Sequence, residues 1–187
     1  MTSPKRFWIL SILAGLLCTV PPIAGAQELP IAYPDHEGTT AYSGETPTPE
    51  EIIGHQIGTT HTRPAQVVEY YHAIEEASDR VQVEEHARSY EGRRLIHAFV
   101  SSPENLARLD EIRRNNRRLV EEPEQVSDEE IQDMPGVIYI GYSIHGDEAS
   151  GTEAAILTLY HLAAGEDQSV SEVLDNLVVI LDPMLNP

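Results

Sequence analysis

The sequence predicts an α/β fold in which a mixed β-sheet is flanked by helices. An apolar run at residues 137–144, a helical pattern at 146–164 and a second apolar run at 177–181 follow one another as a strand–helix–strand unit. Such a unit makes the two strands parallel. Upstream, strand-like runs at 81–90 and 95–101 are joined by a short turn, which predicts an antiparallel hairpin. Parallel and antiparallel pairs in one chain indicate a mixed sheet.

Residues 1–26 have the pattern of a cleaved signal peptide. Lys5 and Arg6 precede an apolar stretch at 7–20, and the small residues at 24–26 fit a cleavage site. A membrane anchor is the alternative, but the stretch is too short for a hydrocarbon core of ~30 Å. We therefore expect export to the periplasm or the extracellular space, without stable membrane association after signal cleavage.

Charge and cysteine content narrow the chemistry. The formal net charge is -19, and such a surface repels nucleic acid and anionic membranes, so neither is an expected partner. The acidity is typical of a solubility or salt adaptation and identifies no substrate. The single cysteine, Cys18, lies in the signal segment, so metal ligands of the mature chain must come from His, Asp or Glu.

The remaining segments upstream of the strand–helix–strand unit have simple patterns. Residues 27–63 are rich in Pro, Gly and Thr and lack periodicity, which predicts an extended N-terminal arm. Apolar residues at helical spacing predict a helix over 64–78. A second helix is expected after Ser102, which caps it, with Pro103 in its first turn. Residues 121–133 form an acidic connection.

The chemistry is expected directly after the run at 137–144. His145 follows this strand, which we predict to be buried, and Glu148 comes three residues later, where the chain turns into the next helix. Ligands of open α/β sheets bind at the C-terminal ends of the strands. Gly146 permits a tight bend between the two residues. An imidazole and a carboxylate can supply two of the three protein ligands that a catalytic zinc needs. The His-x-x-Glu spacing alone is common by chance, and the alternative is that both residues only decorate the start of the helix, where an acid suits the helix dipole.

Three segments together resemble the zinc metallocarboxypeptidases of the carboxypeptidase A type. Residues 143–154, Ser-Ile-His-Gly-Asp-Glu-Ala-Ser-Gly-Thr-Glu-Ala, resemble the first zinc motif of that family. Residues 89–95 resemble the hairpin that precedes the motif, and residues 184–187, Met-Leu-Asn-Pro, resemble the start of its Asn-Pro-Asp-Gly segment. The resemblance implies a carboxypeptidase-like, phosphorylase/hydrolase-like catalytic domain over 64–187. It implies Zn²⁺ as the cofactor, with His145 and Glu148 as ligands.

The resemblance also implies that only the N-terminal part of this domain is present. The third zinc ligand, the general base and the residues that bind the substrate carboxylate are expected beyond Pro187, so no catalytic residue is assigned here. The expected reaction is the hydrolysis of C-terminal residues from peptides or proteins by metal-activated water. We expect the isolated chain to be inactive, and to be poorly folded or a weak metal binder.

Two other functions fit parts of the pattern. One is a zinc deacylase of the aspartoacylase type, which has a similar His-Gly-x-Glu motif, and the other is a non-catalytic zinc- or peptide-binding module. Among the neighbouring polar residues, we interpret Asp147 as exposed or as orienting a ligand, and Glu153 as structural. Asn186 is a weaker candidate for the lining of the cleft.

Overall fold

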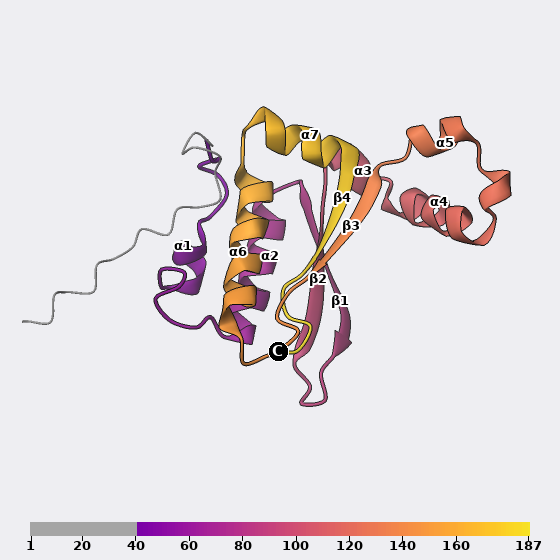
Figure 1. Ribbon diagram of the computed structural model, residues 1–187. Coiled ribbons are helices and arrows are strands. Elements are labelled where there is room, and N and C mark those ends of the chain that lie inside the picture. The colour runs from indigo at the N-terminus through magenta and orange to yellow at the C-terminus, as the bar shows by residue number, and fades with distance from the viewer. Residues whose placement is uncertain (1–40) are drawn as a thin grey trace, which may run out of the picture. The chain divides into compact units, whose positions relative to one another are not determined.

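The computed structural model describes residues 41–187, and within that range a four-stranded mixed sheet is the central element (Figure 1). Its strands lie in the order β1-β2-β4-β3. β1 pairs antiparallel with β2, β2 pairs antiparallel with β4, and β4 pairs parallel with β3. The mixed sheet confirms the predicted fold class, and the parallel β3–β4 pair confirms the predicted strand–helix–strand unit. The strand bounds are Val81–Arg88 for β1, Arg94–Val100 for β2, Gly136–Gly141 for β3 and Leu177–Asp182 for β4.

The hairpin between β1 and β2 is closed by the turn that the sequence predicts. The Gly92 amide donates to the Ser89 carbonyl at 2.8 Å, and the Ser89 amide donates to the Arg93 carbonyl at 2.8 Å. Gly92 has a φ of 81°, in the left-handed region that suits glycine, so a side chain at this position would be strained.

One face of the sheet is covered by two long helices that lie side by side (Figure 1). These are α2, Pro64–Ala77, and α6, Ala149–Ala164. Both helices and the strands direct apolar side chains into one core, where full burial of an aliphatic or aromatic side chain contributes about 1.5–3 kcal/mol. Side chains with at most 1% exposure in this core include Val67, Tyr70, Tyr71, Ile74, Ile96, Ala98, Val100, Ile156, Leu159 and Leu181.

The opposite face of the sheet carries a smaller core under α4, Leu109–Glu121, formed by Phe99, Leu109, Ile112 and Val178. The single helix predicted after Ser102 is divided here into α3, Pro103–Leu106, and α4. The Ser102 hydroxyl caps α3, as predicted, by accepting from the Asn105 amide at 3.5 Å. The buried Asn105 side chain donates to the Leu174 carbonyl at 3.2 Å, which ties α3 to the neighbouring helix at the point where the predicted helix breaks.

Four short elements are not predicted from the sequence. Three of them lie in segments read as connections, because they are short or mostly polar: η1, Pro123–Gln125; α5, Asp128–Gln132; and α7, Gln168–Asn176. The fourth, α1, Pro49–Ile53, lies in the predicted arm. None of the helices described for residues 41–187 combines the length and hydrophobicity that a membrane-spanning segment needs.

The predicted signal segment and the start of the predicted arm lie outside the described residues, but residues 41–63 are described. In this range the prediction of an extended arm is wrong. Thr48 begins α1 with a capping contact, its amide donating to the Glu51 carboxylate at 2.8 Å. Ile53 and Ile57 are buried in the main core, at 5% and 1% exposure. The apolar residues are too widely spaced to show periodicity, yet tertiary packing orders the segment.

The prediction that residues 137–144 form a buried strand is correct for the strand and wrong for its burial. β3 lies at the edge of the described sheet, with β4 as its one partner strand there. Val137, Ile138 and Tyr139 are 43%, 42% and 55% exposed. An apolar run is the pattern of a strand covered on both faces. Among residues 41–187, however, neither a strand nor a helix covers the exposed side chains of Val137, Ile138 and Tyr139.

Candidate metal centre

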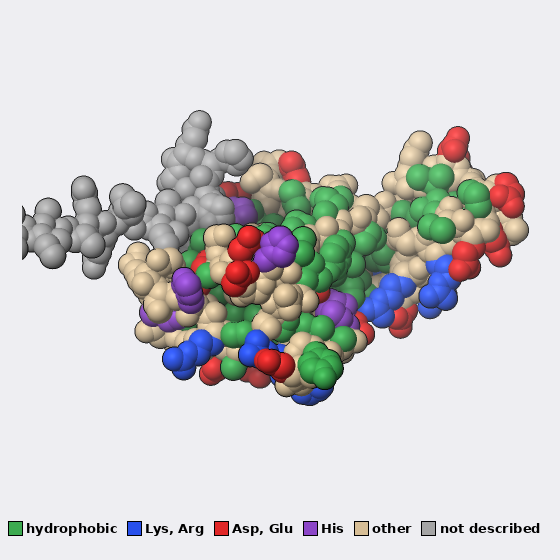
Figure 2. Space-filling view, turned by 60° about the horizontal axis from the view of Figure 1, so that its bottom comes forward, with side chains coloured by type: hydrophobic (Ala, Val, Ile, Leu, Met, Phe, Trp, Pro, Cys, Tyr) green, Lys and Arg blue, Asp and Glu red, His purple; other side chains and the backbone are tan. Residues whose placement is uncertain are grey.

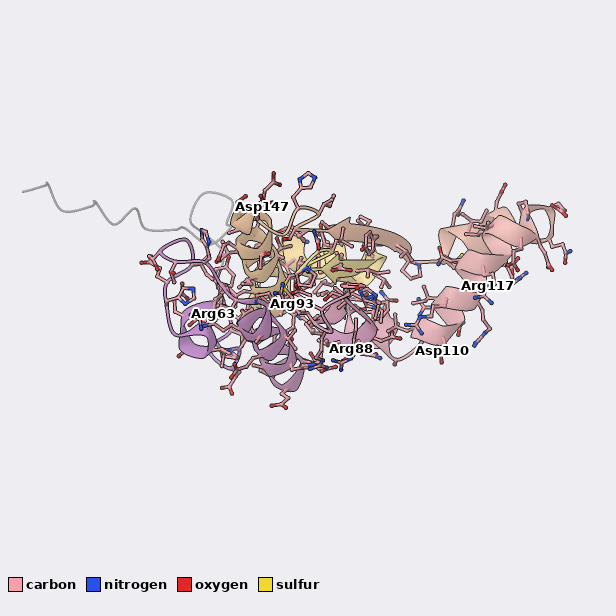
Figure 3. The ribbon with its side chains drawn as sticks, turned by 90° about the horizontal axis from the view of Figure 1, so that it is seen from below. Arg63, Arg88, Arg93, Asp110, Arg117 and Asp147 are labelled. Carbon is pink, nitrogen blue, oxygen red and sulfur yellow. The ribbon has the colours of Figure 1, made fainter. Side chains whose placement is uncertain are left out.

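His145 and Glu148 lie in the loop between the end of β3 and the start of α6, as the sequence predicts. The Glu148 amide donates to the His145 carbonyl at 3.0 Å, which closes a tight turn and brings both side chains to the same side. Both are well exposed, at 70% and 66% of the side-chain surface. Asp147, between them on this loop, lies at the surface (Figure 3).

The two side chains are close enough to share a metal ion. The His145 Nδ1 lies 3.2 Å from the Glu148 Oε2. Zinc bonds of about 2.0–2.2 Å in tetrahedral geometry place neighbouring ligand atoms about 3.4 Å apart. The observed separation therefore fits a shared Zn²⁺. A bound metal ion would take the place of this direct contact between the two side chains, because imidazole and carboxylate bind metal in their deprotonated forms.

The loop is fixed by the segment that follows β4. Beyond the last strand pair, the Tyr142 amide donates to the Asp182 carbonyl at 2.9 Å, and the Leu185 amide donates to the Tyr142 carbonyl at 3.0 Å. The Asn186 amide then donates to the Ser143 carbonyl at 3.1 Å. These bonds extend the parallel pairing past both strands, up to the residue two positions before His145. The loop is therefore held by backbone groups.

Gly146 is required at its position by this close approach of backbone. A Cβ at residue 146 would lie 2.3 Å from the Asn186 carbonyl oxygen, far inside van der Waals contact. Ser143 has a φ of 50°, a left-handed conformation that is uncommon for a residue with a side chain and costs about 1–2 kcal/mol. Both features show that the backbone makes a tight turn at the point where the side chains of His145 and Glu148 emerge.

A small cavity of about 130 Å³ lies beside the loop. Its wall includes Gly146 and Asp147 from the loop, Pro64 from the start of α2 and Pro187 from the segment after β4. Asn186 is not among its lining residues, so the structure does not place it in the cleft. Its contribution is the backbone contact to Ser143 and Gly146.

The other acids and histidines of the described chain have structural partners or stand apart. Glu153 is buried and accepts from the Thr62 amide at 2.8 Å and the Thr62 hydroxyl at 3.1 Å, which agrees with the structural role predicted for it. Within residues 41–187, no group of three or more His, Cys, Asp or Glu side chains is arranged to hold a metal ion. His145 and Glu148 therefore have no third potential ligand beside them among the described residues.

Asp182 is a residue near the site that the sequence reading missed. It ends β4 and is 1% exposed. Its Oδ2 accepts from the Tyr139 hydroxyl at 3.2 Å and pairs with His86 Nε2 at 3.2 Å, while its Oδ1 accepts from the Met184 amide at 3.2 Å. A charged residue at the end of an apolar strand, before a proline, is the sequence signal that could have indicated it.

Burial at this end of the sheet shifts several protonation equilibria. Burial, and then the charge of Asp182, raise the pKa of the Tyr139 phenol. Burial also raises the pKa of Tyr71 well above its ordinary value, with smaller contributions from Tyr142 and Asp182. Burial and the neighbouring His86, whose ring stacks at 4.9 Å, lower the pKa of His97. Tyr139, Tyr71 and His97 therefore stay neutral near pH 7.

Comparison with known proteins agrees with the resemblance seen in the sequence. The sequence model of the family described as zinc carboxypeptidase matches residues 67–187. Among solved structures, carboxypeptidase A from Helicoverpa armigera is similar at 16% identity and a TM-score of 0.47; the match covers 74% of this chain and 30% of that one. None of the curated proteins matches. Because the family match extends over more than half of the sequence, the chain belongs to the zinc carboxypeptidase family.

Proposed function

We propose that His145 and Glu148 are two ligands of a catalytic Zn²⁺ in a metallocarboxypeptidase that removes C-terminal residues from peptides. The observation that supports this most directly is the 3.2 Å separation of His145 Nδ1 and Glu148 Oε2 in a loop fixed by backbone contacts. The membership of the zinc carboxypeptidase family supports the reaction class. The chain spans 30% of the length of the solved carboxypeptidase to which it is similar.

The chemistry divides between the metal and the chain. When bound, zinc would polarise the scissile carbonyl and lower the pKa of its water toward ~7. His145 and Glu148 would hold the ion at the C-terminal end of β3, and the contact of Gly146 with the segment after β4 would keep both ligands in register. Among residues 41–187, no third His, Cys, Asp or Glu joins His145 and Glu148 to complete a zinc site. We assign neither a general base nor a residue that binds the substrate carboxylate.

Substitution of the ligands tests this proposal. In the zinc-loaded peptidase, His145→Ala and Glu148→Ala should each abolish hydrolysis and lower zinc content after dialysis, measured by atomic emission. Asp147→Ala is the matched control, because it removes an exposed acid from the same loop and should leave zinc content unchanged. Full zinc content in both ligand variants would disprove the ligand assignment.

The choice of substrate separates the proposed peptidase from a deacylase. A carboxypeptidase should release the last residue from a blocked dipeptide faster than it hydrolyses an N-acetylated amino acid. The reverse preference would favour the aspartoacylase-type reaction. For residues 1–187 alone we expect no measurable turnover with either substrate, because two ligands are fewer than a catalytic zinc requires.

We also propose that the protein is exported, on the basis of the signal pattern over 1–26. Expression in a bacterial host followed by mass spectrometry of the periplasmic fraction tests this. The expected mature protein begins at Gln27. An intact N-terminus in the cytoplasmic fraction would contradict the proposal.

A further inference from the structure

A second cavity lies next to the candidate metal centre, between the start of α2 and the tip of the β1–β2 hairpin. It measures about 640 Å³, which is within the range of small-ligand sites. Its lining combines apolar side chains with three arginines and includes no acidic residue: Arg63, Pro64, Ala65, Val68, Gly92, Arg93 and Arg94. We call it the arginine groove. The chain has 12 Lys and Arg against 31 Asp and Glu, so three arginines on one groove stand out against the overall charge.

The arginine groove adjoins the cavity beside His145 and Glu148. Pro64 lines both cavities. Arg93 Nη1 donates to the Pro187 carbonyl at 2.6 Å, and Pro187 also lines the smaller cavity. A chain lying in the groove would therefore continue toward the metal loop. The face on which α2 begins and the hairpin turns carries basic side chains beside apolar surface (Figure 2).

The three arginines differ in how far they are committed to other contacts. Arg94 pairs with Glu85, and Arg93 pairs with Glu91 at 2.8 Å on an exposed surface. Arg63 is exposed, and its guanidinium forms no ion pair with another described residue. It precedes α2, whose first turn contains no acid to offset the positive end of the helix dipole. Among the three arginines of the groove, Arg63 is thus the one that no other described residue pairs with and that is available to a ligand.

We propose that the arginine groove binds an acidic segment of the peptide substrate, upstream of the residue that is removed. This inference rests on the proposed peptidase function and adds a substrate preference to it. Guanidinium groups bind carboxylates through paired hydrogen bonds. The apolar wall formed by Pro64, Ala65 and Val68 suits the methylene groups of glutamate or a neighbouring aliphatic residue. Screening over ~8 Å at physiological salt limits the repulsion from the acidic remainder of the surface.

A binding measurement without turnover tests the proposal. A fluorescent peptide of alternating Glu and Leu, amidated at its C-terminus, is titrated into the zinc-free protein and followed by fluorescence anisotropy. A matched peptide carries Gln in place of Glu. We expect the Glu peptide to bind more tightly, and we expect Arg63→Gln to weaken its binding about three- to tenfold, the range for one exposed to partly desolvated ion pair. The Gln peptide should be unaffected by this substitution.

The control is Arg117→Gln, which makes the same charge change on α4, remote from the groove (Figure 3). It should change binding of the Glu peptide by less than about twofold. Arg63→Lys should retain most of the affinity, and circular dichroism should show unchanged folding in all three variants. Equal losses for Arg63→Gln and Arg117→Gln would overturn the proposal, because they would indicate bulk electrostatics alone.

Two further outcomes would also overturn it. One is binding that requires a free C-terminal carboxylate on the peptide, and the other is tighter binding of inorganic phosphate than of the peptide. His145→Ala and Glu148→Ala should bind the Glu peptide as the unsubstituted protein does. Full zinc content in both of these variants, with retained peptide binding, would disprove the proposed function and leave the groove intact. Loss of zinc in both variants, with no discrimination between the Glu and Gln peptides by the unsubstituted protein, would overturn the groove and leave the proposed function intact.

Discussion

Replacing Asp182 should destabilise the protein more than replacing any exposed acid. Its carboxylate is 1% exposed and has three hydrogen-bond partners at 3.2 Å: Tyr139, His86 and the Met184 amide. Hydrogen bonds to a charged group contribute about 1.5–3 kcal/mol, and these three lie at the long end of the range. We therefore take the lower limit for each of the three bonds and expect Asp182→Ala to lower the free energy of unfolding by about 4.5 kcal/mol.

The asparagine variant separates shape from charge. Asp182→Asn keeps an acceptor for the Met184 amide and nearly the same volume, so we expect a loss of about 1–2 kcal/mol. Urea unfolding followed by circular dichroism gives both values by linear extrapolation. Asp133→Ala, at an exposed position, should change the free energy by less than about 0.5 kcal/mol. A loss below about 1 kcal/mol for Asp182→Ala would refute the argument that the buried carboxylate organises this end of the sheet.

Three other predictions follow from contacts in the described chain. Glu153→Ala should cost about 2–3 kcal/mol, because it leaves the Thr62 amide and hydroxyl without their buried acceptor, and limited proteolysis should then cut within residues 41–63 more rapidly. Burial lowers the pKa of His97, so as pH falls the unfolded chain binds a proton at this histidine, near the ordinary pKa of 6.5, before the folded chain does. The free energy of unfolding should therefore decrease as pH falls below about 6.5. His97→Gln should make this decrease smaller, as measured by urea unfolding at several pH values. Gly146→Ala should lower the free energy of unfolding by about 1–3 kcal/mol and weaken zinc binding, because its Cβ would lie 2.3 Å from the Asn186 carbonyl oxygen. Urea unfolding and calorimetric titration with Zn²⁺ would contradict this if they showed an unchanged free energy of unfolding and an unchanged affinity.

The elements that could be predicted are those whose pattern is local. α2 begins at Pro64 and has apolar residues at helical spacing, and the β1–β2 turn contains a glycine with positive φ. The parallel pairing of β3 and β4 follows from the helix between them, because a crossover connection makes its two strands parallel. Each of these signals is complete within a short window of sequence.

The features that could not be predicted depend on partners distant in the chain. α1 is held by the contacts of Ile53 and Ile57 with the main core, and Asp182 meets a side chain 96 positions before it. The arginine groove brings Arg63 next to the hairpin tip at Gly92 and Arg93, which is too far along the sequence for a local pattern to include both. The exposure of β3 was missed for a different reason. An apolar run indicates that a strand suits a buried position, but it does not indicate which element covers the strand.

The same distinction applies to the candidate metal centre. The motif at 145–148 identifies two donor atoms, whereas their 3.2 Å separation depends on how the loop is held. The loop is held by backbone bonds from residues 185 and 186, and this segment leaves β4 directly after the buried Asp182. If this arrangement governs the proposed site, Asp182→Asn should weaken Zn²⁺ binding although its side chain contacts neither His145 nor Glu148. Calorimetric titration of that variant with Zn²⁺, under conditions in which the variant is fully folded, checks this. An unchanged affinity would show that the loop holds its geometry independently of the end of β4.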